Sequence, residues 1–195
     1  MSLIKQLARI RSMQRKTRRG WRSGVAAVEF ALTLPIWITL MLGMADAAYF
    51  VLVCGKADRI AYTVTNIVTQ YTTITKADLK DILLAAPQLM QPVTFGQNGV
   101  VVISSIYQPP GQGPIIKWQY TGGGTATQVS QIGSMGSAAQ LPNGLTLNDG
   151  DNVIVSEVYF NFVPMFVASA IVPSSSIYRV AIYKPRQGAL ITPPT

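Results

Sequence analysis

The stretch GVAAVEFALTLP, Gly24–Pro35, opens an apolar run that decides the fold we expect. The run continues to Cys54 and holds two charged residues, Glu29 and Asp46. Because a bilayer core about 30 Å thick is crossed by roughly 20 apolar helical residues, residues 25–54 are long enough to span a membrane. A carboxylate inside such a span is unfavourable, so the position of Glu29, just inside the membrane, indicates that the protein uses it.

Basic residues are concentrated ahead of this run. Residues 1–24 contain half of the 16 Lys and Arg residues of the chain and no acidic residue. A basic flank directly before an apolar span follows the positive-inside rule, which places the N-terminus in the cytoplasm and everything after about residue 50 outside. The flank is not accompanied by an aromatic or glycine-rich pattern, so we do not expect nucleic-acid binding. The basic residues are Lys5, Arg9, Arg11, Arg15, Lys16, Arg18, Arg19 and Arg22.

Three interpretations of the apolar run compete. A secretory signal peptide cleaved at Ala45–Ala47 is disfavoured, because its apolar core normally has about 7–15 residues and here the apolar character continues to Cys54. A plain uncleaved anchor is the second. The third is a prepilin-type signal, cut on the cytoplasmic side after Gly24, which leaves the span on the mature protein with Val25 as its first residue.

The third interpretation gives Glu29 a physical role. Cleavage would free an α-amino group on Val25, which is mostly cationic because its pKa lies near 8. That ammonium can neutralise a carboxylate which the bilayer otherwise penalises, and in a helical assembly the pair would join neighbouring subunits and set their axial register. The alternative is that Glu29 only reaches towards the headgroups. Pro35 should loosen or kink the helix, and we expect Asp46 at the outer membrane boundary.

An apolar stripe of helical period follows the span. Its members recur at alternating spacings of four and three residues, which predicts one helix from about residue 25 to residue 71. We expect this stripe to pack on a soluble head. It consists of Val53, Ala57, Ile60, Val64, Ile67 and Tyr71.

The remaining chain alternates between helix and strand signals. Thr75–Asp78 predicts a capped helix start, and Pro87 is expected to end that helix. β-rich runs at 100–107, 115–120, 153–162 and 176–183 predict a sheet of about four antiparallel strands, with a mobile loop or short helix at 122–140 and an exposed tail from Lys184. The sequence therefore predicts a pilin-like α+β fold: a basic leader (1–24), a transmembrane helix (25–54) and one head (55–195).

The motif Gly24-Val25-Ala26-Ala27-Val28-Glu29-Phe30-Ala31-Leu32, followed by Pro35, resembles the TadE/TadF-type pseudopilins of the tight adherence (Tad) pilus system. The resemblance covers residues 18–59 and returns weakly at 158–164 and 183–186. It implies cleavage between Gly24 and Val25 by a prepilin peptidase, and a role for Glu29, Phe30 and Pro35 in assembly or register. It also implies a bacterial inner-membrane protein with a periplasmic head, whose partners are other pilins or pseudopilins and the inner-membrane assembly platform.

Catalysis and metal binding have few candidate residues. The chain has no histidine and one cysteine, so we expect no enzyme activity, no cofactor and no site of clustered His and Cys ligands. Asn148-Asp149-Gly150-Asp151-Asn152 could be weighed as a calcium loop, but its spacing favours a turn. The main functional alternative to a processed pseudopilin is an unprocessed, single-pass periplasmic binding or scaffold protein.

Overall fold

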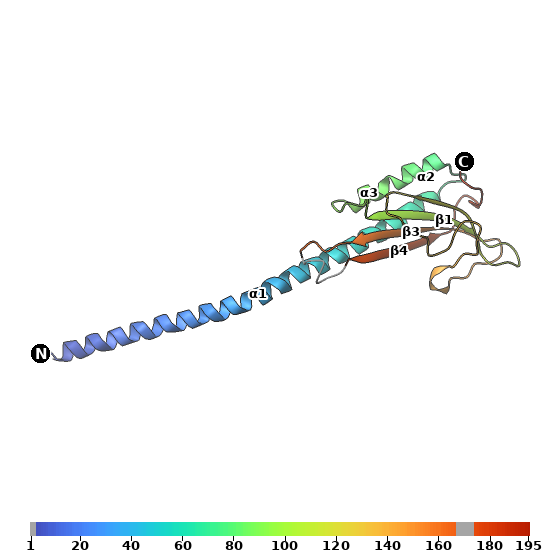
Figure 1. The fold of residues 1–195 in the computed structure, drawn as a ribbon. Helices are drawn as coiled ribbons and strands as arrows, with labels where there is room; N and C mark the ends of the chain where they lie inside the picture. Colours follow the sequence, from blue (N-terminus) through green and yellow to red (C-terminus); the bar gives the residue numbers. More distant parts are fainter. Residues whose placement is uncertain (1–2, 167–173) are drawn as a thin grey trace. The chain divides into compact units, whose positions relative to one another are not determined.

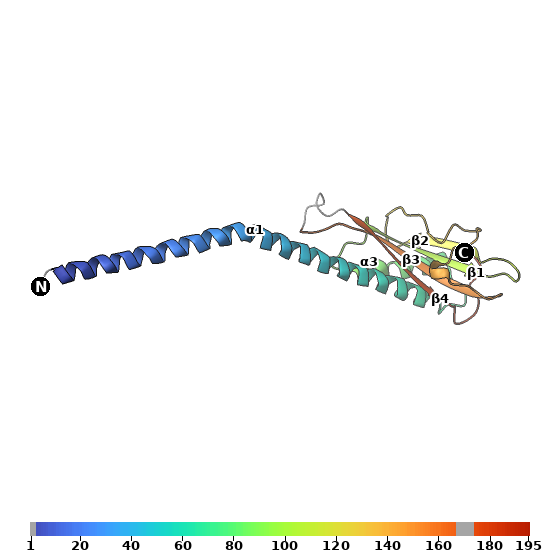
Figure 2. The ribbon, with the colours of Figure 1, turned by 90° about the horizontal axis from the view of Figure 1, so that it is seen from below.

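The structure is a computed structural model that describes residues 3–166 and 174–195, with side chains described from residue 24 onward except at residue 143. The chain divides into two compact units, Met1–Asp46 and Ala47–Thr195. The first unit consists of the N-terminal part of helix α1, which spans Leu3–Val68 (Figure 1). The second unit contains the end of α1 and the rest of the chain (Figure 2).

Helix α1 is continuous through Pro35. Proline lacks the N–H that would donate to the preceding turn, so its neighbourhood has one backbone carbonyl fewer in a helical hydrogen bond. Two threonine hydroxyls donate to nearby carbonyls, from Thr33 to Phe30 O (3.1 Å) and from Thr39 to Pro35 O (2.9 Å). The long helix expected from about 25 to 71 is thus present, ending at Val68 and beginning before the apolar run.

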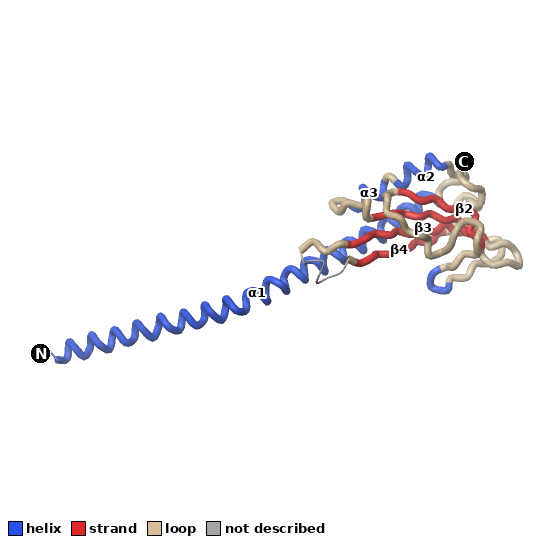
Figure 3. The backbone as a smooth tube through the Cα atoms, viewed as in Figure 1, coloured by secondary structure: helices blue, strands red, loops and turns tan. Residues whose placement is uncertain are grey.

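The second unit is built on a four-stranded antiparallel sheet, which confirms the predicted α+β fold (Figure 3). Its strands are β1 (Gly99–Tyr107), β2 (Ile115–Gly122), β3 (Asn152–Phe162) and β4 (Ser175–Tyr183). They lie in the order β2-β1-β3-β4, so β1 and β3 are the central strands. A short 3-10 helix, η1 (Pro142–Gly144), lies between β2 and β3.

The register of β1 and β2 changes once. Ser105 pairs with Trp118 and Ile106 pairs with Ile116, so one extra residue of β2 is left between the two pairs. A bulge of this kind reverses which face alternate side chains occupy. Trp118 therefore joins the core on the helix side of the sheet, whereas Ile116 packs in a second cluster with Ile106 and Val155.

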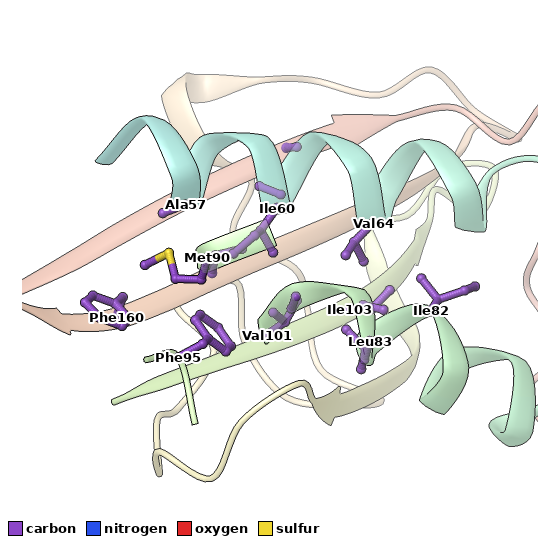
Figure 4. Close-up of a cluster of buried hydrophobic side chains, with 14 of the residues drawn as sticks. Ala57, Ile60, Val64, Ile82, Leu83, Met90, Phe95, Val101, Ile103 and Phe160 are labelled. Atoms are coloured by element: carbon purple, nitrogen blue, oxygen red, sulfur yellow. The ribbon is translucent and has the colours of Figure 1, made fainter. Parts of the chain in front are cut away.

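The principal core lies between the sheet and three helices: the end of α1, α2 (Lys76–Leu83) and α3 (Ala85–Met90). Figure 4 shows Ala57, Ile60 and Val64 of α1 directed towards strand residues such as Ile103 and Phe160. Full burial of a side chain of this size contributes roughly 1.5–3 kcal/mol. The burial of this helical face therefore stabilises the packing of the end of α1 on the sheet.

A buried polar contact accompanies this apolar packing. The Ser156 hydroxyl of β3 donates to Ala61 O of α1 (2.8 Å) and lies 2.6 Å from the Thr65 hydroxyl. Ser156 and Thr65 are both fully buried. Because buried hydroxyls are costly unless they are hydrogen-bonded, this contact favours one register of the helix on the sheet.

Helix α2 begins as the sequence predicts. Thr75 accepts a hydrogen bond from the Asp78 N–H, and Asp78 in turn accepts one from the Thr75 N–H, which forms a capping box. The prediction that Pro87 ends this helix is wrong, because α2 ends at Leu83 and Pro87 is the third residue of α3. Proline is tolerated in a first helical turn, where its missing N–H would have no helical partner.

The prediction of an exposed tail after Lys184 is also wrong in part. Leu190 is buried in the principal core, with 3% of its surface exposed. Its carbonyl accepts hydrogen bonds from the Trp118 indole (2.8 Å) and the Ser105 hydroxyl (2.6 Å), and its N–H donates to Asn152 (2.8 Å). The C-terminal segment is therefore fastened to the sheet by its backbone, which hydrophobicity patterns do not reveal.

Candidate functional site

The motif that decides the fold lies on the exposed surface of α1. Val25 and Phe30 are 56% and 64% exposed, and Glu29 is exposed beside them. No heavy atom lies within 4 Å of the position that a Cβ on Gly24 would take. Among the described residues, one helical stretch, Gly24–Val68, is long and apolar enough to cross a membrane by length and composition.

Val25 and Glu29 are one helical turn apart. Residues separated by four positions lie on the same face of a helix, with about 5–6 Å between their Cβ atoms. A free amine on Val25 would therefore lie about one helical turn from the Glu29 carboxylate. Pro35 lies further along the same helix, in its exposed apolar part. The geometry brings the five residues Gly24, Val25, Glu29, Phe30 and Pro35 onto one lipid-compatible segment.

The stripe expected to pack on the head faces the sheet. Its first four members are fully buried in the principal core, and Ile67 and Tyr71 are partly buried against it. Tyr71 lies beyond the end of α1 at Val68. This face holds the end of α1 on the sheet within the second unit; its buried members are Val53, Ala57, Ile60 and Val64.

A carboxylate that the sequence motifs do not reveal lies on the other face of the sheet. Glu157, in the middle of β3, is fully buried. It accepts hydrogen bonds from the Gln131 N–H (2.9 Å), the Tyr159 hydroxyl (2.8 Å) and the Tyr178 hydroxyl (3.1 Å), and also from the Ser130 hydroxyl. A single acid inside the apolar strand 153–162 is the signal that could have revealed it, since a buried carboxylate requires several donors.

These contacts fasten the long connection between β2 and β3 to the sheet. Ser130 and Gln131 belong to that connection, and the neighbouring Ile132 is buried against Ile116 and Ile106. Burial, together with the Glu157 carboxylate, raises the pKa of the Tyr159 and Tyr178 hydroxyls well above their ordinary value of 10.0. Both phenols thus remain hydrogen-bond donors at neutral pH. This stretch, which the sequence predicts as a mobile loop or a short helix, is a loop held by specific side chains.

The residues weighed as a calcium loop form a turn. Gly150 has φ of 86°, and its N–H donates to Gln108 O (2.8 Å). Asp151 accepts from the Asn148 N–H (3.1 Å) and pairs with Lys184 at 2.7 Å. The hydrogen bond from Lys184 lowers the pKa of the Asp151 carboxyl below its usual value. Within residues 24–166 and 174–195, no group of three or more His, Cys, Asp or Glu residues is placed to hold a metal ion.

Two residues at the end of the expected span are more enclosed than a simple membrane boundary requires. Asp46, which we expect at the outer membrane boundary, is 5% exposed. Cys54 is a free thiol and is also buried. Burial explains Cys54 as a small apolar side chain of the core, in keeping with the absence of a second cysteine to pair with.

Residues 24–63 match the model of a family described as TadE-like protein. The resemblance stated from the Gly24–Pro35 motif is therefore confirmed over this segment, which covers the exposed apolar helix and the first half of the stripe that faces the sheet. The match indicates a protein associated with the Tad pilus, whose TadE-like members are structural proteins. No curated protein and no solved structure matched the chain.

Proposed function

We propose that this chain is a minor pseudopilin that a prepilin peptidase cleaves after Gly24 and that then takes part in assembling a Tad/Flp-type pilus. It acts as a structural protein rather than an enzyme. Residues 1–24 are its cytoplasmic leader, 25–54 its inner-membrane span and 55–195 its periplasmic head. Its partners are the peptidase, other pilins or pseudopilins and the inner-membrane assembly platform.

The observation that supports this proposal best is the placement of Glu29 on an exposed apolar helix, within the segment that matches the TadE-like family. A lone carboxylate in lipid costs about 2.5–3.5 kcal/mol at the bilayer centre and less near the interface. Cleavage after Gly24 supplies a compensating ammonium one helical turn away. In an assembled pilus the same ammonium could serve the Glu29 of a neighbouring subunit, which would fix the axial offset between the two.

Processing and assembly can be tested separately in cells. Gly24→Ala should slow the conversion of the full-length chain to the shorter mature form on a gel, whereas Gly43→Ala, at another uncrowded helical glycine, should not. Glu29→Ala should abolish piliation while the head remains folded, because the span loses the partner of the new amine. Normal pili assembled with the Glu29→Ala protein would contradict the role proposed for this residue.

An unprocessed anchor is the second candidate, and the continuity of α1 favours it. The Gly24–Val25 bond lies inside a helix that runs from Leu3 to Val68. Because proteases bind their substrates in extended form, cleavage requires this helix to open locally. A chain that stays unprocessed requires no such opening. In that case the head would be a periplasmic binding or scaffold module held by a permanent single span.

A further inference from the structure

A second apolar surface adjoins the end of the expected span. It is formed by the end of β3 and the residues that follow it: Val163, Met165 and Phe166 are 53%, 62% and 50% exposed. Large apolar side chains exposed together in this way mark a surface that contacts a partner or a membrane. They lie in the head, more than ninety residues along the chain from the end of α1 at Val68.

Aromatic contacts place this surface beside α1. The Phe162 ring lies 5.2 Å from the ring of Phe50 in an edge-to-face arrangement, and 5.5 Å from the ring of Tyr49. The next two residues of α1, Val51 and Leu52, are 69% and 47% exposed. The apolar surface of α1 at 50–52 therefore continues onto the end of β3. We name these six residues the interfacial patch: Phe50, Val51, Leu52, Val163, Met165 and Phe166.

The length of the helix sets the depth of this patch. A bilayer with its headgroup layers is about 40–45 Å thick, which corresponds to roughly 27–30 helical residues at about 1.5 Å per residue. Counted from Val25, this thickness ends between Val51 and Cys54. Phe50–Leu52 thus fall in the outer interfacial layer, where aromatic side chains such as Tyr49 and Phe162 are favoured.

The distribution of charge supports the same placement. Residues 47–55 and 158–166 contain no charged side chain, and the first charged residue after the patch on α1 is Lys56. A surface that docked on a polar protein would be expected to carry a polar rim. Here the apolar surface is instead continuous with the candidate membrane helix, so the occupant that fits it is the lipid of the same bilayer.

We propose that Val163, Met165 and Phe166 enter the outer interfacial layer of the membrane beside Phe50–Leu52, so that the head is held on the bilayer at two points. This proposal rests on the proposed membrane span of α1. It adds a lipid contact made by the head itself, which must be released when the subunit leaves the bilayer for a pilus. The residues that follow β3 then form a reversible contact between the head and the membrane.

Spin labels can measure the depth of the patch in the full chain. The chain, with Cys54→Ser, is reconstituted in vesicles of phosphatidylethanolamine and phosphatidylglycerol, with one label at Val51→Cys, Met165→Cys or Met135→Cys. Met135 is the matched control, since it is a 65% exposed methionine of the same head. The N–H of its neighbour Gly136 donates a hydrogen bond to Ile116 O, at the end of the sheet opposite Phe162. At ~3.4 Å per strand residue, the two ends of the sheet are about 30 Å apart. Collisions with oxygen report lipid, and collisions with a nickel chelate report water.

The label at Met165 should resemble that at Val51, with more oxygen and fewer nickel collisions than the label at Met135. A Met165 label as open to nickel as the Met135 label would overturn the proposal while leaving the span intact, provided that the Val51 label still reports lipid. A Val51 label open to nickel would overturn the span and the proposal together. Shielding of Met165 from both reagents, relieved by diluting the protein in lipid, would show that a second copy covers the patch and would also refute the proposal.

The labelled positions are at least half exposed, so the fold should tolerate the changes. All of these proteins also carry Trp21→Phe and Trp37→Phe, so that the buried Trp118 is the one remaining tryptophan. Each labelled protein is compared with its Cys54→Ser parent by the fluorescence of Trp118. If the fluorescence is unchanged, the head is still folded, and the differences in collision rate report the depth of the label in the membrane. If Met165→Cys unfolds the head, Phe166→Cys provides the same measurement at the adjacent position.

Discussion

Replacement of Glu157 tests how the head is stabilised. Glu157→Ala removes the acceptor of the Gln131 N–H and of the Tyr159, Tyr178 and Ser130 hydroxyls. A hydrogen bond to a charged group contributes about 1.5–3 kcal/mol, and a buried donor left without a partner costs about 1–3 kcal/mol. Water can reach part of the site, because three of the four contacts are only partly buried. We therefore expect a loss of about 3–5 kcal/mol in the free energy of unfolding, not the sum of four bonds.

Glu157→Gln is the matched control for shape. Its oxygen can still accept from the Gln131 N–H, and its amide can donate to the Ser130 hydroxyl, so we expect a loss of only about 1–2 kcal/mol. Unfolding of the full chain in micelles by denaturant measures both variants. It is followed by the fluorescence of Trp118 in chains that carry Trp21→Phe and Trp37→Phe, because the sequence has three tryptophans. Amide exchange at Gln131 reports whether the loop is released. If the alanine variant unfolded within about 1 kcal/mol of the parent with Gln131 still protected, Glu157 would not hold this loop.

The remaining stability predictions concern the core and alkaline pH. Ile60→Ala, at a fully buried position of α1, should lower the free energy of unfolding by about 2–5 kcal/mol. Leu84→Ala, at a 56% exposed position, should change it by less than about 0.5 kcal/mol. Equal effects of the two changes in the same denaturant titration would refute the packing of α1 on the sheet. The raised pKa values of Tyr159 and Tyr178 mean that the folded head disfavours the phenolates, so their contribution to stability is fully present below the unfolded pKa of about 10 and is lost as the pH rises above it. Denaturation midpoints from about pH 8 to about pH 11 should therefore fall above pH 10, and less steeply for Tyr178→Phe than for the parent; parallel curves would contradict the assignment.

Much of the fold could be predicted because its signals are local or periodic. The apolar length of residues 25–54, the stripe from Val53 to Val64 and the four β-rich runs each follow from one-dimensional patterns, and the cap at Thr75 depends on residues three positions apart. The prediction that Pro87 ends α2 was wrong because proline can follow the end of one helix or lie in the first turn of the next. That distinction depends on the turn at Leu84, which sequence spacing does not encode.

The polar contacts of the head could not be predicted, because they join distant parts of the chain. Glu157 meets donors from a loop about 26 residues earlier and from β4, and the Leu190 backbone meets side chains of three strands. Neither pairing has a hydrophobic period. The bulge beside Ser105 has a similar effect, since it places Trp118 and Ile116, two residues apart, on opposite faces of the sheet. The candidate assembly residues, by contrast, were visible at once, because a charge inside an apolar run is conspicuous without any tertiary information.

The measurement that tests the central claim most directly is the N-terminal sequence of the protein extracted from the membranes of cells that assemble the pilus. A mature chain beginning at Val25 is the result expected from cleavage after Gly24, with the new amine one turn from Glu29. A chain that still begins at Met1 while pili form normally would contradict the account and support a permanent anchor. A chain beginning at Ala48 would also contradict it, since the head would then have been released from its span.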